Sequence, residues 1–340
     1  MPPQAAQRDF RVAANRTPFE PAAHAADWRC GVARLGSRGR LGVEMVNAAG
    51  EGRRLPRRPA SNLAERWTRV DGVDVFFRES PAPVEGARVI AHIHGFGLSG
   101  RYLLPTAERL ADEFQTYVPD LPGFGRSGRR PDMLDIPDLA HAAIRFLDDR
   151  GVGRATLVGN SMGCPVIIEC AHRYPERVDR AVLVSPAGGA FNRPLRRAVA
   201  QLSRDAPREP ARMARVAVPD YARFGVPSTM RLFRALTRYP SLQRLLELRI
   251  PTLVVLGSRD PLLPNSHRIG EIASRTDSHV LVVLLEGAAH AINFSHPDQL
   301  AHVIRLFMDD RPIENDPEWP GHVRLYEVHR GANHPRAESP

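Results

Sequence analysis

The stretch Ala155–Ala171 reads ATLVGNSMGCPVIIECA, an apolar run joined to a helix-like segment by a corner that carries Ser161. The apolar run predicts a buried strand and the segment after the corner predicts a helix. A tight strand-to-helix turn needs glycine at both ends, here Gly159 and Gly163, because a β-carbon would collide with the adjoining strand or helix. Such a turn lifts the serine hydroxyl clear of its backbone and sets the amide of Met162 at the positive end of the helix. The corner therefore offers a candidate nucleophile and a candidate oxyanion donor.

Strand-like and helix-like segments alternate on both sides of this corner. Strands are expected at 67–80 (a hairpin), 87–93, 116–118, 180–184, 252–256 and 280–285, and helices at 102–114, 136–149 and 297–308. This alternation predicts an α/β fold with a mostly parallel, doubly wound sheet that is covered on both faces.

Two segments depart from the alternation, and both ends of the chain are polar. Residues 192–249 contain short amphipathic segments broken by prolines, which predicts a helical insertion. The expected organisation is a disordered extension at 1–65, a core at 66–187 and 251–311, a helical cap at 188–250 and a tail at 312–340. Met45 lies inside the extension and is a candidate for a later translation start.

The composition argues against a nucleic-acid-binding, disulfide-rich, metal-binding or membrane-spanning protein. The 340 residues carry a formal charge of +9, but lysine does not occur and all 47 basic residues are arginine, which points to biased codon supply rather than a nucleic-acid surface. The three cysteines, Cys30, Cys164 and Cys170, predict neither a disulfide framework nor a metal site. No secretion signal and no apolar run of membrane-spanning length occurs, so we expect a cytoplasmic protein without stable membrane insertion.

A serine nucleophile needs a base and a carboxylate that orients it. Asp260 follows the strand at 252–256 and His290 follows the strand at 280–285, and parallel strands present their carboxyl ends at one sheet edge. We therefore expect Ser161, Asp260 and His290 to converge. An aspartate before proline is also a common turn residue, and a loop histidine is commonly solvated, so each residue alone is weak evidence.

The segment His94-Gly95-Phe96-Gly97 follows another strand and offers the second oxyanion donor, the amide of Phe96. His94 is expected to brace that loop. The competing histidines lie away from the catalytic edge in the predicted elements: His267, His279, His296 and His302.

These motifs, with the loop DLPGFGRS at 120–127, GSRDPLLP at 257–264 and GAAHAINFSHPDQL at 287–300, resemble the α/β-hydrolase superfamily, in particular serine hydrolases with a helical cap. The resemblance spans roughly 67–310 and implies a lid between the strands at 180–184 and 252–256. Serine rather than aspartate at position 161 tells against epoxide hydrolases and haloalkane dehalogenases.

The favoured function is hydrolysis of a carboxylic ester or lactone through an acyl-enzyme, without metal or organic cofactor. The partner is a small-molecule substrate with an apolar acyl part. Its expected contacts are Phe96, Asn160, Phe224, Met230 and Phe233. Apolar residues at helical spacing are more often the core of a cap, which is the alternative reading of the last three.

Two other functions stay open. GNSMG resembles carbon-carbon hydrolases of ring-cleavage dienones, but those usually carry glycine where Cys164 stands and tryptophan where Ala291 stands. A ligand receptor on the same fold is the second alternative. Substrate identity and oligomeric state do not follow from the sequence.

Overall fold

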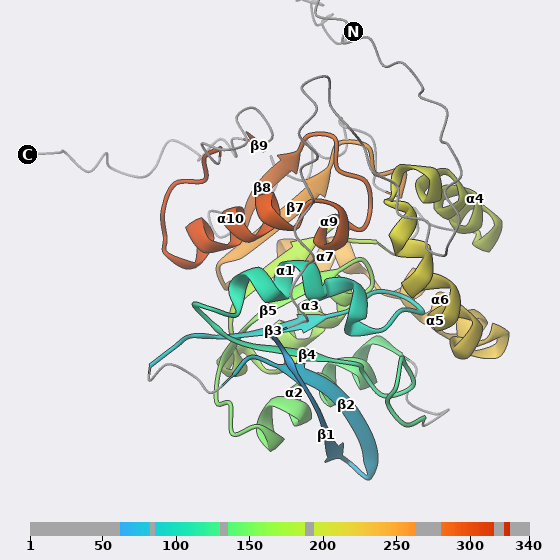
Figure 1. The fold of residues 1–340 in the computed structure, drawn as a ribbon, viewed down its shortest axis with the longest axis horizontal. Coiled ribbons are helices and arrows are strands. Elements are labelled where there is room, and N and C mark those ends of the chain that lie inside the picture. Colours follow the sequence, from blue (N-terminus) through green and yellow to red (C-terminus); the bar gives the residue numbers. More distant parts are fainter. Residues whose placement is uncertain are drawn as a thin grey trace, which may run out of the picture. The chain divides into compact units, whose positions relative to one another are not determined.

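The computed structural model describes residues 62–81, 86–129, 135–187, 194–262, 280–315 and 323–326. These residues form a nine-stranded sheet in the order β1-β2-β4-β3-β5-β6-β7-β8-β9 (Figure 1). The strands are β1 (Ala64–Val70), β2 (Val73–Glu79), β3 (Val89–Ile93), β4 (Gln115–Pro119), β5 (Ala155–Asn160), β6 (Val178–Val184), β7 (Thr252–Gly257), β8 (Val280–Leu285) and β9 (Val323–Tyr326). Pairing is parallel from β4 through β3, β5, β6 and β7 to β8, and antiparallel at both ends of the sheet. The predicted mostly parallel α/β sheet is confirmed.

Helices cover both faces of the sheet. On one face, α2 (Ile136–Asp149) and α3 (Gly163–Arg173) pack in a core that includes Leu157 of β5. On the other, α1 (Leu104–Leu110) and α10 (Pro297–Met308) pack in a core that includes the next residue, Val158. Successive strand residues point to opposite faces. The continuous apolar run of β5 is therefore explained by burial on both sides.

The expected bounds hold closely for α2, β8 and α10, and they differ where pairing extends an element. The first strand begins three residues before the expected start because Ala64 pairs with Glu79 across the hairpin. Strand β6 begins at Val178, which pairs with Ala155. In the segment expected to be a tail, β9 pairs antiparallel with β8, a contact that depends on a partner strand some forty residues away in sequence.

The segment between β6 and β7 is helical. It contains α4 (Leu195–Asp205), α5 (Ala214–Phe224), α6 (Val226–Arg238) and α7 (Ser241–Leu246), with short 3-10 turns at 206–208 and 211–213. Figure 1 shows α4, α5 and α6 grouped beside the sheet. We refer to residues 194–250 as the helical insertion. The extension expected at 1–65 lies almost entirely outside the described residues.

In the described part of the chain, no helix combines the length and the apolar character that crossing a bilayer demands.

Candidate functional site

The corner after β5 has the geometry that its glycines predict. Ser161 has a φ of 59°, a left-handed conformation that non-glycine residues rarely adopt. A β-carbon at Gly159 would lie 2.6 Å from the side chain of Ile167, and one at Gly163 would collide with the carbonyl oxygen of Ile93. The requirement for glycine at both positions is therefore confirmed. The strained turn holds Ser161 between the end of β5 and the start of α3.

His290 and Asp260 are in direct contact at the ends of neighbouring strands. Asp260 Oδ2 lies 2.7 Å from His290 Nδ1, and Asp260 Oδ1 accepts a hydrogen bond from the amide of Leu262 at 2.8 Å. Both carboxylate oxygens are thus occupied, and the imidazole donates from Nδ1. Nε2 is left as the nitrogen available to a reacting group.

Asn160 links the serine corner to the histidine loop. Its Nδ2 donates to the carbonyl oxygens of His290 at 3.1 Å and Val184 at 3.2 Å, and its Oδ1 accepts from the Tyr102 hydroxyl at 2.8 Å. From its place beside Ser161 in the sequence, Asn160 is expected to contact substrate. The side chain is instead 2% exposed and engaged with the protein on both ends, so its contacts are those of a positioning residue.

Ser161 and His290 each keep a small exposed fraction, 8% and 7%. Among the hydrogen bonds of the described residues, none joins Ser161 Oγ to the imidazole. The bond from Asn160 to the His290 carbonyl ties the residue next to the serine to the histidine itself.

The loop after β3 is held by Tyr102, whose hydroxyl accepts a hydrogen bond from the amide of Gly95 at 2.8 Å. That amide is therefore unavailable to a substrate. In the described residues the amides of Phe96 and Met162 donate to no protein acceptor. Both amides lie on the two segments that approach each other at Gly95 and Ser161.

His94 braces the same loop. Its Nε2 accepts from the amide of Leu121 at 3.0 Å, so Nδ1 carries the proton and donates to the carbonyl oxygen of Gly95 at 3.0 Å. Burial lowers the pKa of His94, which keeps the ring neutral in this role.

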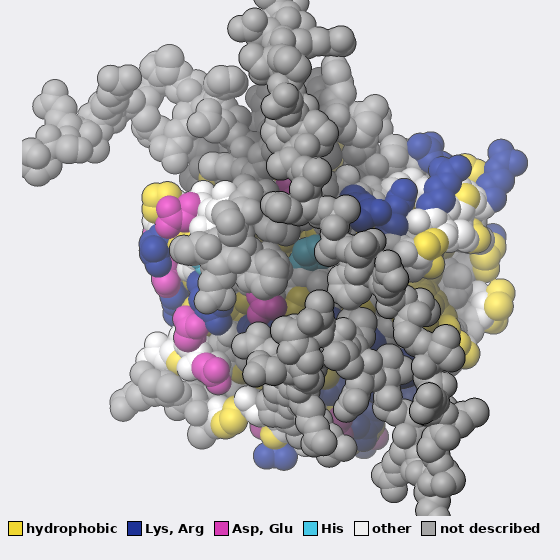
Figure 2. Space-filling model, turned by 45° about the horizontal axis from the view of Figure 1, so that its top comes forward, with side chains coloured by type: hydrophobic (Ala, Val, Ile, Leu, Met, Phe, Trp, Pro, Cys, Tyr) yellow, Lys and Arg dark blue, Asp and Glu magenta, His cyan; other side chains and the backbone are white. Residues whose placement is uncertain are grey.

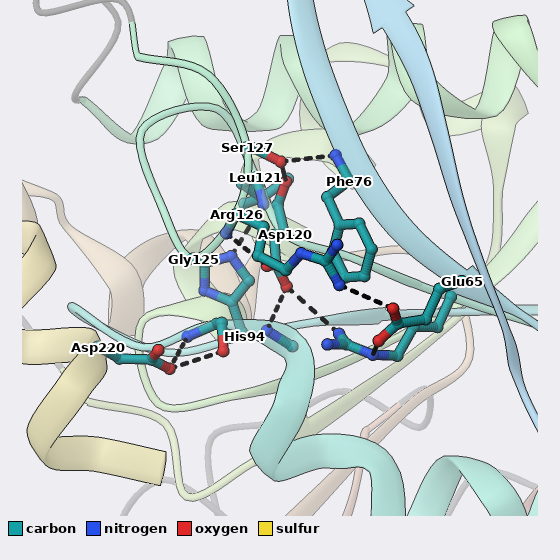
Figure 3. Close-up of polar contacts among 12 residues, drawn as sticks. Glu65, Phe76, His94, Asp120, Leu121, Gly125, Arg126, Ser127 and Asp220 are labelled. Atoms are coloured by element: carbon teal, nitrogen blue, oxygen red, sulfur yellow. Dashed lines mark hydrogen bonds and ion pairs between the residues drawn. The ribbon is translucent and has the colours of Figure 1, made fainter. Parts of the chain in front are cut away.

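Asp120 anchors the neighbouring loop from a buried position (Figure 3). It accepts from the amides of Gly100 at 2.8 Å and Arg126 at 2.9 Å. Figure 3 also shows Asp220 of α5 beside this cluster, where its carboxylate accepts from the amide and hydroxyl of Ser99 at 2.8 and 2.6 Å. The helical insertion is thereby bound to the loop that carries Phe96.

Of the apolar residues expected to contact substrate, only some lie close together in the structure. The ring of Phe224 stacks on Phe124 at 4.8 Å and meets Phe96 edge-on at 6.0 Å. Met230 lies elsewhere, in a groove whose described lining contains none of the other predicted site residues. Phe233 is half-buried on α6. Helical spacing places these residues on the insertion but does not specify which of them faces the loop of Phe96.

Two carboxylates that sequence analysis did not identify reach the histidine loop from the helical insertion. Asp205 Oδ1 accepts from the amide of His290 at 3.2 Å, and Glu209 Oε1 accepts from the amide of Ala291 at 2.6 Å. Both lie in a segment, RDAPRE, whose charges look like an ordinary solvated face. The sequence gives one indication of such a role, which is that these two acidic residues stand among arginines.

The electrostatics around His290 are dominated by these acids. Burial lowers the pKa of the imidazole, but the charge and hydrogen bond of Asp260, together with Asp205 and Glu209, outweigh it and raise the pKa to about 9. Burial also raises the pKa of Asp205, and it raises the pKa of Glu209 to about 7. The surrounding acids therefore favour the protonated form of the imidazole.

Comparison with known proteins finds relatives of several kinds. The chain is 27% identical over 244 residues to a pimeloyl-[acyl-carrier protein] methyl ester esterase of Pectobacterium carotovorum (63% of this chain, 92% of that protein). It is 28% identical over 236 residues to a poly(3-hydroxyalkanoate) depolymerase of Ectopseudomonas oleovorans (63% and 82%). A solved membrane phospholipase A matches with a TM-score of 0.63 and 25% identity over 74% of this chain and 87% of that one.

Two further matches cover a smaller share of the relative's length. The chain is 35% identical over 125 residues to the dihydrolipoyllysine-residue acetyltransferase component of the acetoin cleaving system of Cupriavidus necator, which is 37% of this chain and 33% of that protein. It spans 64% of the counterpart from Pseudomonas putida, again less than two thirds of the relative's length. The model of the alpha/beta hydrolase family matches residues 89–303, which include the strained serine corner and the Asp260–His290 pair. This chain belongs to the alpha/beta hydrolase family.

Proposed function

We propose that the protein is a serine hydrolase that cleaves a carboxylic ester or lactone, with Ser161 as nucleophile, His290 as base and Asp260 as the carboxylate that orients it. The observation that carries the proposal is the 2.7 Å bond between Asp260 and His290 at the strand ends beside a left-handed Ser161. Relatives named as a methyl ester esterase and a depolymerase, and a neighbour named as a phospholipase A, support ester chemistry.

In the proposed reaction, neutral His290 accepts the Ser161 proton at Nε2 as Oγ attacks the substrate carbonyl. The amides of Phe96 and Met162 hold the oxyanion of the tetrahedral intermediate. Its collapse expels the alcohol, which takes the proton from His290, and leaves an acyl-enzyme. Water then attacks the acyl-enzyme as His290 takes its proton, and the breaking C–Oγ bond releases the acid while Ser161 Oγ takes that proton back from His290.

We also propose that the helical insertion acts as a cap over this site. Phe224 of α5 contacts Phe96, and Asp220 holds Ser99, so the insertion forms part of the wall next to the proposed oxyanion donors. The aromatic surface of Phe96, Phe124 and Phe224 suits an apolar acyl group.

The raised pKa of His290 predicts an alkaline activity profile. Because the base must be neutral, kcat/KM is expected to rise with pH until about 9. Asp205→Asn removes one negative charge while its amide oxygen still accepts from the amide of His290. The pKa of His290 should fall by on the order of 1 unit, which raises kcat/KM at pH 7 roughly tenfold. The measurement is the pH dependence of kcat/KM for an aryl ester in both proteins.

The matched control is Glu247→Gln, which removes a carboxylate from the same insertion at a position that accepts from Gln243 rather than from the histidine loop. Its pH profile should coincide with that of the unmodified protein. A profile of Asp205→Asn that stays in place, or moves to higher pH, contradicts this account of the carboxylates.

A substrate panel tests the reaction class. Aryl esters and a lactone are expected to turn over at more than about 1 per second, with an amide and a ring-cleavage dienone slower. Faster loss of the dienone, followed by its visible absorbance, would instead assign carbon-carbon hydrolysis. Saturable binding of panel compounds without turnover would assign a receptor.

A further inference from the structure

The helical insertion exposes most of the large apolar side chains found on the surface. Seven of the eight exposed large hydrophobic residues in the described chain lie on it: Val199, Leu202, Val218, Tyr221, Val226, Met230 and Leu242. Val226 is 74% exposed and Val218 is 66% exposed. Apolar side chains scattered singly over a surface need no explanation, but their concentration on one segment does.

The same segment is strongly basic on its outside. Residues 194–250 contain twelve arginines and four acidic residues. Three of the acids point inward, since Asp205 and Glu209 bind the histidine loop and Asp220 binds Ser99. Figure 2 shows arginine and hydrophobic side chains close together on the side where α4, α5 and α6 lie in Figure 1.

Biased codon supply does not account for this charge. Fourteen arginines outside the insertion form ion pairs within the described residues. In the insertion, Arg244 pairs with Glu169, whereas no ion pair within the described residues involves Arg204, Arg215, Arg231, Arg234 or Arg238. Most arginines of the described core are thus ion-paired, whereas these five arginines of the insertion take part in no ion pair among the described residues.

Helix α6 shows how charge and apolar surface combine. Arg231, Arg234 and Arg238 recur at helical spacing on the face opposite buried Leu232 and Leu236. Together with Met230 they line a groove of about 940 Å³. The rest of the described groove wall consists of one acidic residue, Asp135, and the largely apolar set Ile136, Pro137, Pro227, Ala235, Tyr239 and Pro240. The arginines could bind the anionic headgroup of a lipid while the apolar residues beside them contact its acyl chains.

We propose that the outer surface of the helical insertion docks on the surface of an anionic lipid membrane. A basic helical face with exposed aliphatic residues binds such surfaces by combining shallow apolar burial with attraction to anionic lipids. A second copy of the chain would bring arginine against arginine. Single-stranded nucleic acid is bound through aromatic stacking platforms, whereas six of the seven exposed apolar residues are aliphatic.

The experiment is sedimentation of the full chain with vesicles of phosphatidylcholine alone or mixed equally with phosphatidylglycerol. Binding to the mixed vesicles, with little to the neutral ones, is expected, and 0.5 M NaCl should weaken it. The variant Arg231→Gln/Arg234→Gln/Arg238→Gln should lower the partition coefficient roughly 100-fold, since each basic residue near the surface contributes several-fold. Val218→Ser/Val226→Ser should lower it roughly tenfold.

The matched control is Arg145→Gln/Arg154→Gln/Arg311→Gln, which removes the same charge from exposed, ion-paired arginines of the core. It should change the partition coefficient by less than about threefold, with thermal unfolding midpoints verifying that each variant is folded. Equal loss in both triple variants, or binding that persists without the three α6 arginines, overturns the proposal. So does binding to duplex DNA, or a dimer that dissociates in the α6 variant, in place of vesicle binding.

Discussion

Ser161→Ala is expected to lower kcat for an aryl ester by roughly 10⁶-fold and to abolish covalent labelling by a fluorophosphonate. Labelling requires Oγ to form a bond to phosphorus as fluoride leaves, and alanine has no atom to form it. The corner should survive, because alanine and serine are similarly strained at a φ of 59°. Steady-state kinetics and intact mass after labelling measure the two effects, and the thermal unfolding midpoint checks the fold.

Ser185→Ala is the matched control. Ser185 follows the neighbouring strand β6, has a φ of 48° and is fully buried, so it shares the strain and the setting of Ser161 without its exposure. It should keep both activity and labelling. Labelling that persists in Ser161→Ala and disappears in another serine variant would reassign the nucleophile.

Asp260→Asn is expected to lower kcat/KM by roughly 10⁴-fold while the loop keeps its shape. The amide oxygen would take the hydrogen bond from Leu262 that Oδ1 now accepts, which turns the NH₂ group toward His290 Nδ1. The imidazole would then carry its proton on Nε2 and could not accept one from Ser161. Loss of the carboxylate charge should also lower the pKa of His290, so the acid limb of the profile should move to lower pH.

Asp179→Asn provides the control, because Asp179 is a partly exposed carboxylate of β6 that pairs with Arg154 and Arg180. Its kinetics should match those of the unmodified protein. If Asp260→Asn keeps more than a tenth of kcat/KM, the carboxylate is not the orienting group.

The fold was predictable where the signal is local. Apolar runs ending in glycine-rich turns predicted the parallel strands, and the bounds of α2 and α10 follow from periodicity. At the start of α2, Asp135 also accepts from the amide of Asp138. Strand β9 was missed because four residues carry little pattern and its partner is distant in sequence. The position of Asn160 beside the serine predicts contact with substrate, whereas in the structure its side chain is buried and makes three hydrogen bonds within the protein.

The sequence by itself determined the strained corner at Ser161, since glycine at 159 and 163 leaves out the β-carbons that would collide in so tight a turn, and it determined the order in which strands and helices follow one another. Only the tertiary structure decided which side chains meet across that order. Asp205 and Glu209 reach the histidine loop across more than eighty residues, and among the described residues no ion pair involves the arginines of α6. Such contacts depend on how helices pack against loops, and no local periodicity encodes that packing.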